Sequence, residues 1–241
     1  MFVDKNQDVI LNFYLRRHKI LMEKFNANYD IFNSFLVRDA EYDGEMELPV
    51  LKTSDMLPEG VITFSKAMSS KSKKDYEKWI VFYEYDSEFE RLWNNPKAYL
   101  KKLKKFKGVI SPDFSLYRNM PLVMQIWDTY KGRALASWMQ KNGIEIIPNV
   151  RFGDERTYEF CFDGIEKNKT VAVGTHGCIK RKDDKEYFKK GLSELVKRLS
   201  PKNIIVYGAA PDSIFSEYAD SVNIISFESE FSLSRKRQVT A

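Results

Sequence analysis

Short apolar runs alternate with longer amphipathic segments along most of the chain, and this alternation predicts an α/β fold. The clearest runs are continuously apolar, which is typical of parallel strands covered by helices rather than of half-exposed strands. They lie at residues 108–114, 144–150, 170–173, 203–207 and 223–227. Three weaker runs precede them, at residues 48–51, 61–65 and 79–85.

Segments of helical periodicity separate these runs. The most regular one spans residues 121–140, where apolar side chains recur every four residues, at Leu122, Ile126, Tyr130, Ala134 and Trp138. Pro121 suits the first turn of a helix, and Asn142 with Gly143 suits its end. Less regular patterns predict helices at residues 8–25, 87–106, 185–199 and 211–219, with Pro96 marking a kink or restart.

The number and order of these elements favour a degenerate (βα)8-like barrel. An open, mostly parallel sheet with flanking helices and an irregular N-terminal part is the alternative, because the first three runs lie too close together for full helices between them. No linker separates two domains, so we expect one domain over residues 1–241. Within it, residues 1–45 form a helical lead-in and residues 234–241 a basic, frayed tail.

Composition limits the cellular location and the kind of partner of this protein more than it limits the activity. The 241 residues carry 39 Lys and Arg against 34 Asp and Glu, a net charge of +5 that permits an anionic partner without requiring one. Cys161 and Cys178 are too few for a secreted disulfide framework, and the first residues lack the order of a signal peptide. Since no apolar run could span a bilayer and mean hydropathy is −0.46, we expect a cytoplasmic protein that does not enter the membrane.

Polar side chains gather in the loops that follow consecutive predicted strands. Because the carboxyl ends of parallel strands meet at one edge of a sheet, these side chains should lie close together. They are Asp86, Asp113, Asn149, Arg151, Asp154, Thr175, His176 and Tyr207. Four successive polar loops exceed what capping of the following segments requires, so they predict a catalytic or ligand-binding site.

The binding half of this predicted site centres on a guanidinium. Arg151 would hold a phosphorylated or nucleotide-like anion through two N–H groups. Asn149, Thr175 and Tyr207 would complete the ligand-binding set. A backbone nest for phosphate over residues 174–177 is a weaker hypothesis, because the segment lacks the lysine and the spacing of a P-loop.

The catalytic half would consist of Asp113, Asp154 and His176. Either carboxylate would act as a base or as a ligand for a divalent metal, and the imidazole would transfer a proton. The structural alternative is that the two aspartates cap the segments after them, while Asn149 and Thr175 close turns. No motif defines a reaction, a cofactor or a metal, and the zinc spacings of cysteine and histidine do not occur.

A lysine-rich run provides a different hypothesis. Lys101, Lys102, Lys104 and Lys105 fall in a segment whose apolar residues have helical spacing. Such a run is usually the solvated face of a helix, but it also suits contact with the phosphates of DNA or RNA.

Several sequence segments resemble a family known as domain of unknown function 4417, found in phages, plasmids and integrated elements of Gram-positive bacteria. The segments are FERLWNNPKAYL (89–100), GVISPDFSLYRNMP (108–121), IIPNVRFGDERTYEF (146–160), FDGI (162–165), VGTHGC (173–178) and IIVYG (204–208). They follow the family's order over most of the chain. Many members carry Trp after the arginine of the third segment, where this chain has Phe152.

The resemblance implies a phage or mobile-element protein and brings no catalytic residues with it. Three hypotheses follow. In the first, the strand-end loops bind a phosphorylated or nucleotide-like anion, as a binding site or as an enzyme's active site. In the second, the basic segment 97–107 binds DNA or RNA as an accessory function of a mobile element. In the third, the protein interacts with a host protein.

Overall fold

The computed structural model describes residue 30 and residues 32–239, with side chains as far as residue 235. The chain divides into two compact units, residues 1–38 and 39–241. In the first, the described residues form a 3-10 helix, η1 (Ser34–Val37), whose first turn is held by Asp30. The Asp30 carboxylate accepts hydrogen bonds from the backbone N–H groups of Ser34 and Phe35 at 2.9 and 3.2 Å. The helix predicted at residues 8–25 lies outside the described residues.

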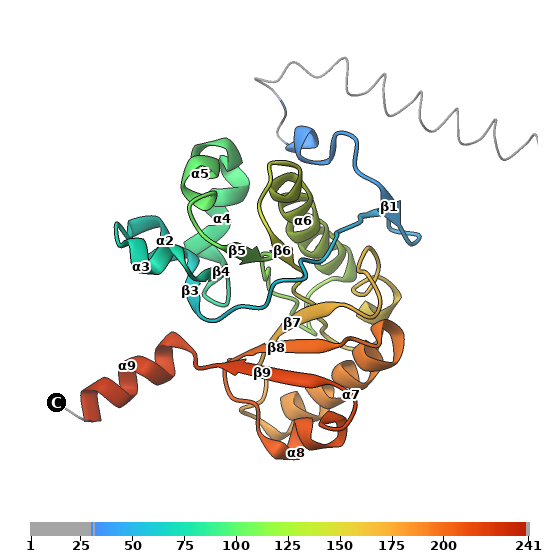
Figure 1. Ribbon diagram of the computed structural model, residues 1–241. Helices are drawn as coiled ribbons and strands as arrows, with labels where there is room; N and C mark the ends of the chain where they lie inside the picture. Colours follow the sequence, from blue (N-terminus) through green and yellow to red (C-terminus); the bar gives the residue numbers. More distant parts are fainter. Residues whose placement is uncertain (1–29, 31, 240–241) are drawn as a thin grey trace, which may run out of the picture. The chain divides into compact units, whose positions relative to one another are not determined.

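Seven parallel strands organise the second unit (Figure 1). One sheet contains β3 (Val61–Thr63), β4 (Trp79–Val81), β5 (Gly108–Ile110) and β6 (Ile146–Ile147). The other contains β7 (Thr170–Gly174), β8 (Asn203–Tyr207) and β9 (Asn223–Phe227). Within each sheet, every strand pairs with the next one along the chain, as in Val173 opposite Val206.

A parallel bridge between Asn149 and Ala172 connects the two sheets. The Ala172 N–H donates to the carbonyl of Pro148, and the Val150 N–H donates to the carbonyl of Ala172, both at 2.8 Å. All seven strands therefore run in chain order and in one direction. The predicted α/β fold with a mostly parallel sheet is confirmed.

Chain-order pairing is also the strand order of a (βα)8 barrel, but the sheet is open. Among the described residues, no hydrogen-bonded pairing closes β3 onto β9. The strands β3 to β6 are only two or three residues long, which leaves few backbone groups for the staggered ladder that closure needs. The contact between the two ends is made by side chains, since Lys66 after β3 forms an ion pair with Glu230 after β9.

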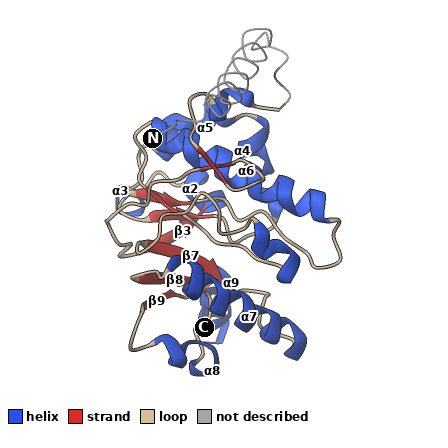
Figure 2. Ribbon diagram, turned by 90° about the vertical axis from the view of Figure 1, so that its right-hand side faces the viewer, coloured by secondary structure: helices blue, strands red, loops and turns tan. Residues whose placement is uncertain are grey.

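Helices alternate with these strands (Figures 1 and 2). They are α2 (Phe64–Ser69), α3 (Lys73–Tyr76), α4 (Asp86–Asn94), α5 (Pro96–Leu103), α6 (Leu122–Lys141), α7 (Lys182–Leu199), α8 (Asp212–Phe215) and α9 (Glu230–Val239), with 3-10 helices η2 (Glu155–Glu159) and η3 (Ser216–Tyr218). The restart predicted at Pro96 is confirmed, because that proline opens α5. No helix in the described part of the chain is both long and apolar enough to cross a bilayer.

The run at residues 48–51 is extended, but only its first half is a strand. β2 (Leu48–Pro49) pairs antiparallel with β1 (Tyr42–Asp43) in a small hairpin, and Leu51 forms an isolated parallel bridge with Ile165. The tail from residue 234 continues as helix α9 as far as Val239. The N-terminus of this helix is capped, because the Ser229 hydroxyl accepts a hydrogen bond from the Ser232 N–H at 3.3 Å.

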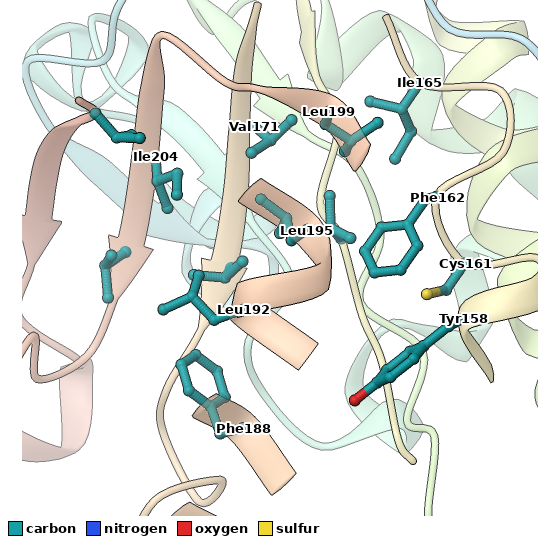
Figure 3. Close-up of a cluster of buried hydrophobic side chains, with 14 of the residues drawn as sticks. Tyr158, Cys161, Phe162, Ile165, Val171, Phe188, Leu192, Leu195, Leu199 and Ile204 are labelled. Atoms are coloured by element: carbon teal, nitrogen blue, oxygen red, sulfur yellow. The ribbon is translucent and has the colours of Figure 1, made fainter. Parts of the chain in front are cut away.

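The apolar side chains of α7 cover one face of β7 and β8 (Figure 3). Phe188, Leu192, Leu195 and Leu199 follow helical spacing and are almost fully buried. Burial of each such side chain contributes about 1.5–3 kcal/mol. The segment around η2 closes the same core with Tyr158 and Phe162.

The alternate residues of β7 and β8 point to the opposite face, where they form a second core with residues of β4, β5 and β6. Its members are Trp79, Val81, Tyr83, Ile110, Ile147, Ala172, Ile205 and Tyr207. The two-residue period of a strand requires this arrangement, because successive side chains point to opposite faces. The period also carries two tyrosines, Tyr83 and Tyr207, to the carboxyl edge of the sheet.

Candidate functional site

The loops that end the strands meet at the carboxyl edge, as predicted. The strands β5, β6, β7 and β8 are neighbours and parallel, so the loops after them share that edge. The fold therefore brings together side chains from four separate stretches of sequence.

A hydrogen-bonded chain of four side chains, Tyr83, Asn149, Asp113 and Arg151, forms the strand-end network. The Tyr83 hydroxyl donates to Asn149 Oδ1 at 2.9 Å, and Asn149 Nδ2 donates to Asp113 Oδ1 at 2.7 Å. The other carboxylate oxygen of Asp113 accepts a long contact of 3.4 Å from Arg151. The oxygen and the nitrogen of the Asn149 side-chain amide are thus both hydrogen-bonded, which fixes the orientation of the side chain.

The backbone of Asn149 is held as firmly as its side chain. Its N–H donates to the hydroxyl of Ser111 at 2.8 Å, and its carbonyl accepts the Arg133 guanidinium at 3.2 Å. Asn149 is only 4% exposed. The sequence produces this arrangement because Ser111 and Asn149 each follow a short buried strand, and those two strands are paired.

Stacked tyrosine rings form one wall of the network. The rings of Tyr83 and Tyr207 lie 4.9 Å apart, at an angle of 17°. Gly174, at the end of β7, permits this packing, because a Cβ there would lie 2.6 Å from the ring of Tyr83. The Tyr207 hydroxyl accepts the backbone N–H of Glu230 at 3.1 Å. Tyr207 therefore borders the network while its own polar group is used by α9.

Thr175 lies beside this wall, but its hydroxyl serves the backbone. It donates to the carbonyl of Ala209 at 2.7 Å and closes the turn after β8. Gly208 is required in that turn, because its φ is 112° and a Cβ would lie 2.6 Å from the Thr175 hydroxyl. The turn-closing alternative therefore accounts for the contacts of Thr175.

Burial and charge act in opposite directions on the two ionic members of the network. Burial raises the pKa of the Asp113 carboxyl above its ordinary value, although Arg151 and Asn149 offset part of that effect. Burial disfavours the charged form of Arg151 too, but the Asp113 carboxylate holds the pKa of the guanidinium above its usual range. Each charge therefore stabilises the other. Their contact of 3.4 Å is nevertheless long, since charge-assisted hydrogen bonds are usually about 2.7–2.9 Å.

Two predicted catalytic residues do not join the network. The Asp154 carboxylate accepts the backbone N–H of Arg156 at 3.1 Å and its Nε at 3.0 Å, so it caps η2. These hydrogen bonds hold the pKa of Asp154 below its ordinary value. His176 is exposed, and its ring centre lies 5.8 Å from that of Phe231. Partial burial and nearby Lys180 lower the pKa of His176.

Asp86 lies close to the network without bonding to it directly. It is the first residue of α4, and its carboxylate accepts the Ser115 N–H at 3.1 Å and the Ser115 hydroxyl at 3.0 Å. This pairing ties the loop after β5 to the start of α4. The negative charge of Asp86 also contributes to the raised pKa of Asp113.

The sequence interpretation missed two members of the site, Tyr83 and Arg133. Tyr83 could have been found from its alternation with Trp79 and Val81 at the end of a strand. Arg133 lies inside the most regular helix, where a charged residue among buried positions is itself a signal. It is 4% exposed, and burial lowers its pKa to about 10.

A small cavity of about 20 Å³ adjoins the network, enough for about one water molecule. Its walls include Asn149, Arg151, Arg133, Asp128 and Cys161. Arg133 donates to the carbonyls of Asn149 and Cys161, while its Nε has no hydrogen-bond partner among the described residues. Two guanidinium groups thus border one cavity, with a carboxylate on its rim.

Metal ligands do not gather anywhere in the described ranges. Within residues 30 and 32–239, no three side chains of His, Cys, Asp or Glu are placed to hold one ion. Cys161 is buried, and burial raises the pKa of its thiol well above the ordinary value. Cys178 contacts the carbonyl of His176 at 3.7 Å.

Comparison with known proteins identifies the family. The model for DUF4417, a domain of unknown function, matches residues 40–228. The Gene 1 protein of Mycobacterium phage L5 is 33% identical over 186 residues, which are 76% of this chain and 79% of that protein. The Gene 1 protein of Mycobacterium phage D29 is 34% identical over 143 residues, 59% of this chain and 51% of that protein. No solved structure matches. The chain therefore belongs to the DUF4417 family, and the resemblance found in the sequence is confirmed.

Proposed function

We propose that this DUF4417 protein binds a phosphorylated or nucleotide-like small molecule at the strand-end network, with Arg151 as the anion-binding residue. One observation supports this most strongly. Arg151 is partly exposed, and its only ion pair among the described residues is the 3.4 Å contact to Asp113. Its other N–H groups are available to a ligand, and a guanidinium can bind a phosphate with two of them. Catalytic roles for Asp113, Asp154 and His176 stay predictions.

Asp113 would regulate this binding rather than contribute to it directly. An anion at Arg151 competes with the Asp113 carboxylate for the same guanidinium. Because the pKa of Asp113 is already raised, the carboxyl can take up a proton when an anion arrives. Anion binding should therefore be coupled to proton uptake and should strengthen as pH falls toward the pKa of Asp113.

Thermal unfolding with AMP as the probe tests the proposal, with adenosine as the uncharged comparison at matched ionic strength. AMP should raise the melting temperature with the logarithm of its concentration above Kd, since a ligand at about 100 times its Kd stabilises by about 2.7 kcal/mol. Adenosine should have little effect. Arg151→Gln should abolish the shift, whereas Arg156→Gln should preserve it, because Arg156 is exposed and pairs with Asp154.

Asp113→Asn separates anion binding from the alternative roles of the carboxyl. An anion-binding Arg151 predicts equal or tighter binding of AMP by this variant, with a weaker dependence on pH. If Asp113 instead contributes to binding as a base or as a metal ligand, the Asp113→Asn variant should bind AMP more weakly than the unmodified protein. The proposal fails if AMP gives no shift with the unmodified protein, or if Arg151→Gln shifts as much as the unmodified protein does.

A further inference from the structure

Positive charge is concentrated in one part of the chain. Residues 69–78 and 97–107 together contain ten lysines and two acidic residues, a net charge of +8. The whole chain carries +5, so the remainder is acidic overall. The modest net charge therefore conceals a strongly basic region, and the local field there is larger than the total suggests.

The fold joins these two segments into one surface. The rings of Tyr76, in α3, and Phe106, after α5, meet edge to face with centres 5.1 Å apart. Lys102 Nζ lies 5.1 Å from the centre of the Tyr76 ring and donates to the carbonyl of Ser70. Lys107 pairs with Glu77 at 3.0 Å. The segment carrying α3 is thus fixed against the end of α5.

Six exposed lysines of this surface have no ion pair within the described part of the chain. They form two arms. Lys71, Lys73 and Lys74 lie just before and in the first turn of α3, and Lys101, Lys104 and Lys105 lie in the last turn of α5 and just after it. The two acidic residues in the region, Asp75 and Glu77, are already paired with Lys78 and Lys107. Unpaired charges of one sign repel each other, so this surface is arranged for an external polyanion rather than for stability.

We propose that this lysine surface binds the phosphate backbone of double-stranded nucleic acid without regard to sequence. The aromatic side chains argue against single strands, because Phe106 is buried and Tyr76 is partly buried beneath Lys102 and Lys105. They argue equally against a membrane surface, since no large apolar side chain of the two segments is exposed. A duplex carries phosphates on both of its strands, so it offers contacts to both arms of lysines.

Binding of the full chain to a fluorescent 24-base-pair DNA of arbitrary sequence tests this inference, measured by anisotropy at several KCl concentrations. We expect a Kd of roughly 1–100 μM near 0.15 M salt and a steep loss of affinity as salt rises. The single strand of the same length should bind more weakly. Equal or tighter binding of the single strand, or no binding at low salt, would overturn the inference.

Matched variants test whether both arms take part. Lys71→Gln with Lys73→Gln and Lys74→Gln, and separately Lys101→Gln with Lys104→Gln and Lys105→Gln, should each weaken binding at least about tenfold near 0.1 M salt. Each should also flatten the salt dependence, by about one unit of slope per lost contact. Lys102 is left in place because it holds Tyr76.

A control removes the same charge elsewhere. Lys167, Lys197 and Lys202 are exposed and lie outside both segments, so their replacement by Gln should change affinity by less than about threefold. Arg151→Gln should leave duplex binding unchanged, which separates this surface from the strand-end network. A control set as damaging as either arm, or an arm without effect, would refute the two-armed surface. Equal capture by anionic phosphatidylserine vesicles or polyglutamate would refute the duplex as its partner.

Discussion

The strand-end network and the lysine surface handle charge in opposite ways. In the network, Asp113 is 7% exposed and bonds to both Asn149 and Arg151. On the lysine surface, six ammonium groups face solvent and have no carboxylate partner among the residues that the structure describes. A buried charge is costly unless it is paired, whereas an exposed charge is well solvated and costs little. Substitutions in the network should therefore change stability as well as binding, and substitutions on the lysine surface should change binding alone.

The largest expected effect on stability comes from the guanidinium beneath the network. Arg133→Ala should lower the free energy of unfolding by about 3 kcal/mol or more, because it leaves the buried carbonyls of Asn149 and Cys161 without their donors and opens a cavity. Urea denaturation measures this loss. Arg156→Ala, at an exposed position, is the control and should cost much less. A loss under about 1 kcal/mol for Arg133→Ala would show that water replaces the guanidinium easily.

Crowding at the tyrosine wall should have the next largest effect. Gly174→Ala should destabilise by about 1–3 kcal/mol, because the added methyl group meets the ring of Tyr83. Gly60→Ala is the matched control, since a Cβ there makes only an ordinary contact of 3.5 Å with Lys78. In a double-mutant cycle, Tyr83→Ala should relieve part of the cost of Gly174→Ala. Strictly additive losses would contradict the proposed contact.

The raised pKa of Asp113 predicts a pH dependence of stability that its amide variant lacks. Burial raises the pKa of Asp113 in the folded protein above the ordinary 3.8, so the folded state retains the proton at a pH where the unfolded chain has lost it. Stability from this group is therefore present below that value and decreases as pH rises through the folded pKa. As pH rises, the free energy of unfolding of the unmodified protein should therefore decrease relative to that of the Asp113→Asn variant. The opposite slope would show that Arg151 outweighs burial.

The smallest effect is expected on the lysine surface. Replacing Lys71, Lys73 and Lys74 by Gln should change the free energy of unfolding by less than about 0.5 kcal/mol, because exposed side chains without partners contribute little. Removing mutual repulsion makes slight stabilisation the expected direction at low salt. Thermal melts at two salt concentrations measure it. A loss above about 1 kcal/mol would mean that these lysines have structural partners, which would erase the contrast between the two regions.

Local patterns in the sequence were enough to predict that most strands are parallel, although they did not separate a closed barrel from an open sheet. Continuous apolar runs separated by helical segments specify buried parallel strands, and parallel strands place their following loops at one edge. For that reason Asp113, Asn149 and Arg151 could be expected at one edge of the sheet from the sequence. The helix over residues 121–140 was equally predictable, because its periodicity is local and its ends carry ordinary stop signals.

Which polar atoms in those loops contact one another depends on the folded chain and could not be predicted from local patterns. Asp154 and Asp113 occupy similar positions after strands, yet one caps η2 and the other bonds to Asn149. The hydroxyl of Thr175 is used by Ala209, a partner 34 residues away in sequence. Likewise, the lysine-rich run near α5 was visible in the sequence, but its union with the lysines of α3 was not, because the packing of Tyr76 against Phe106 brings the two segments together. Periodicity records how each segment faces its neighbours, whereas hydrogen bonds and shared charge depend on distances of a few ångströms between atoms far apart in the chain.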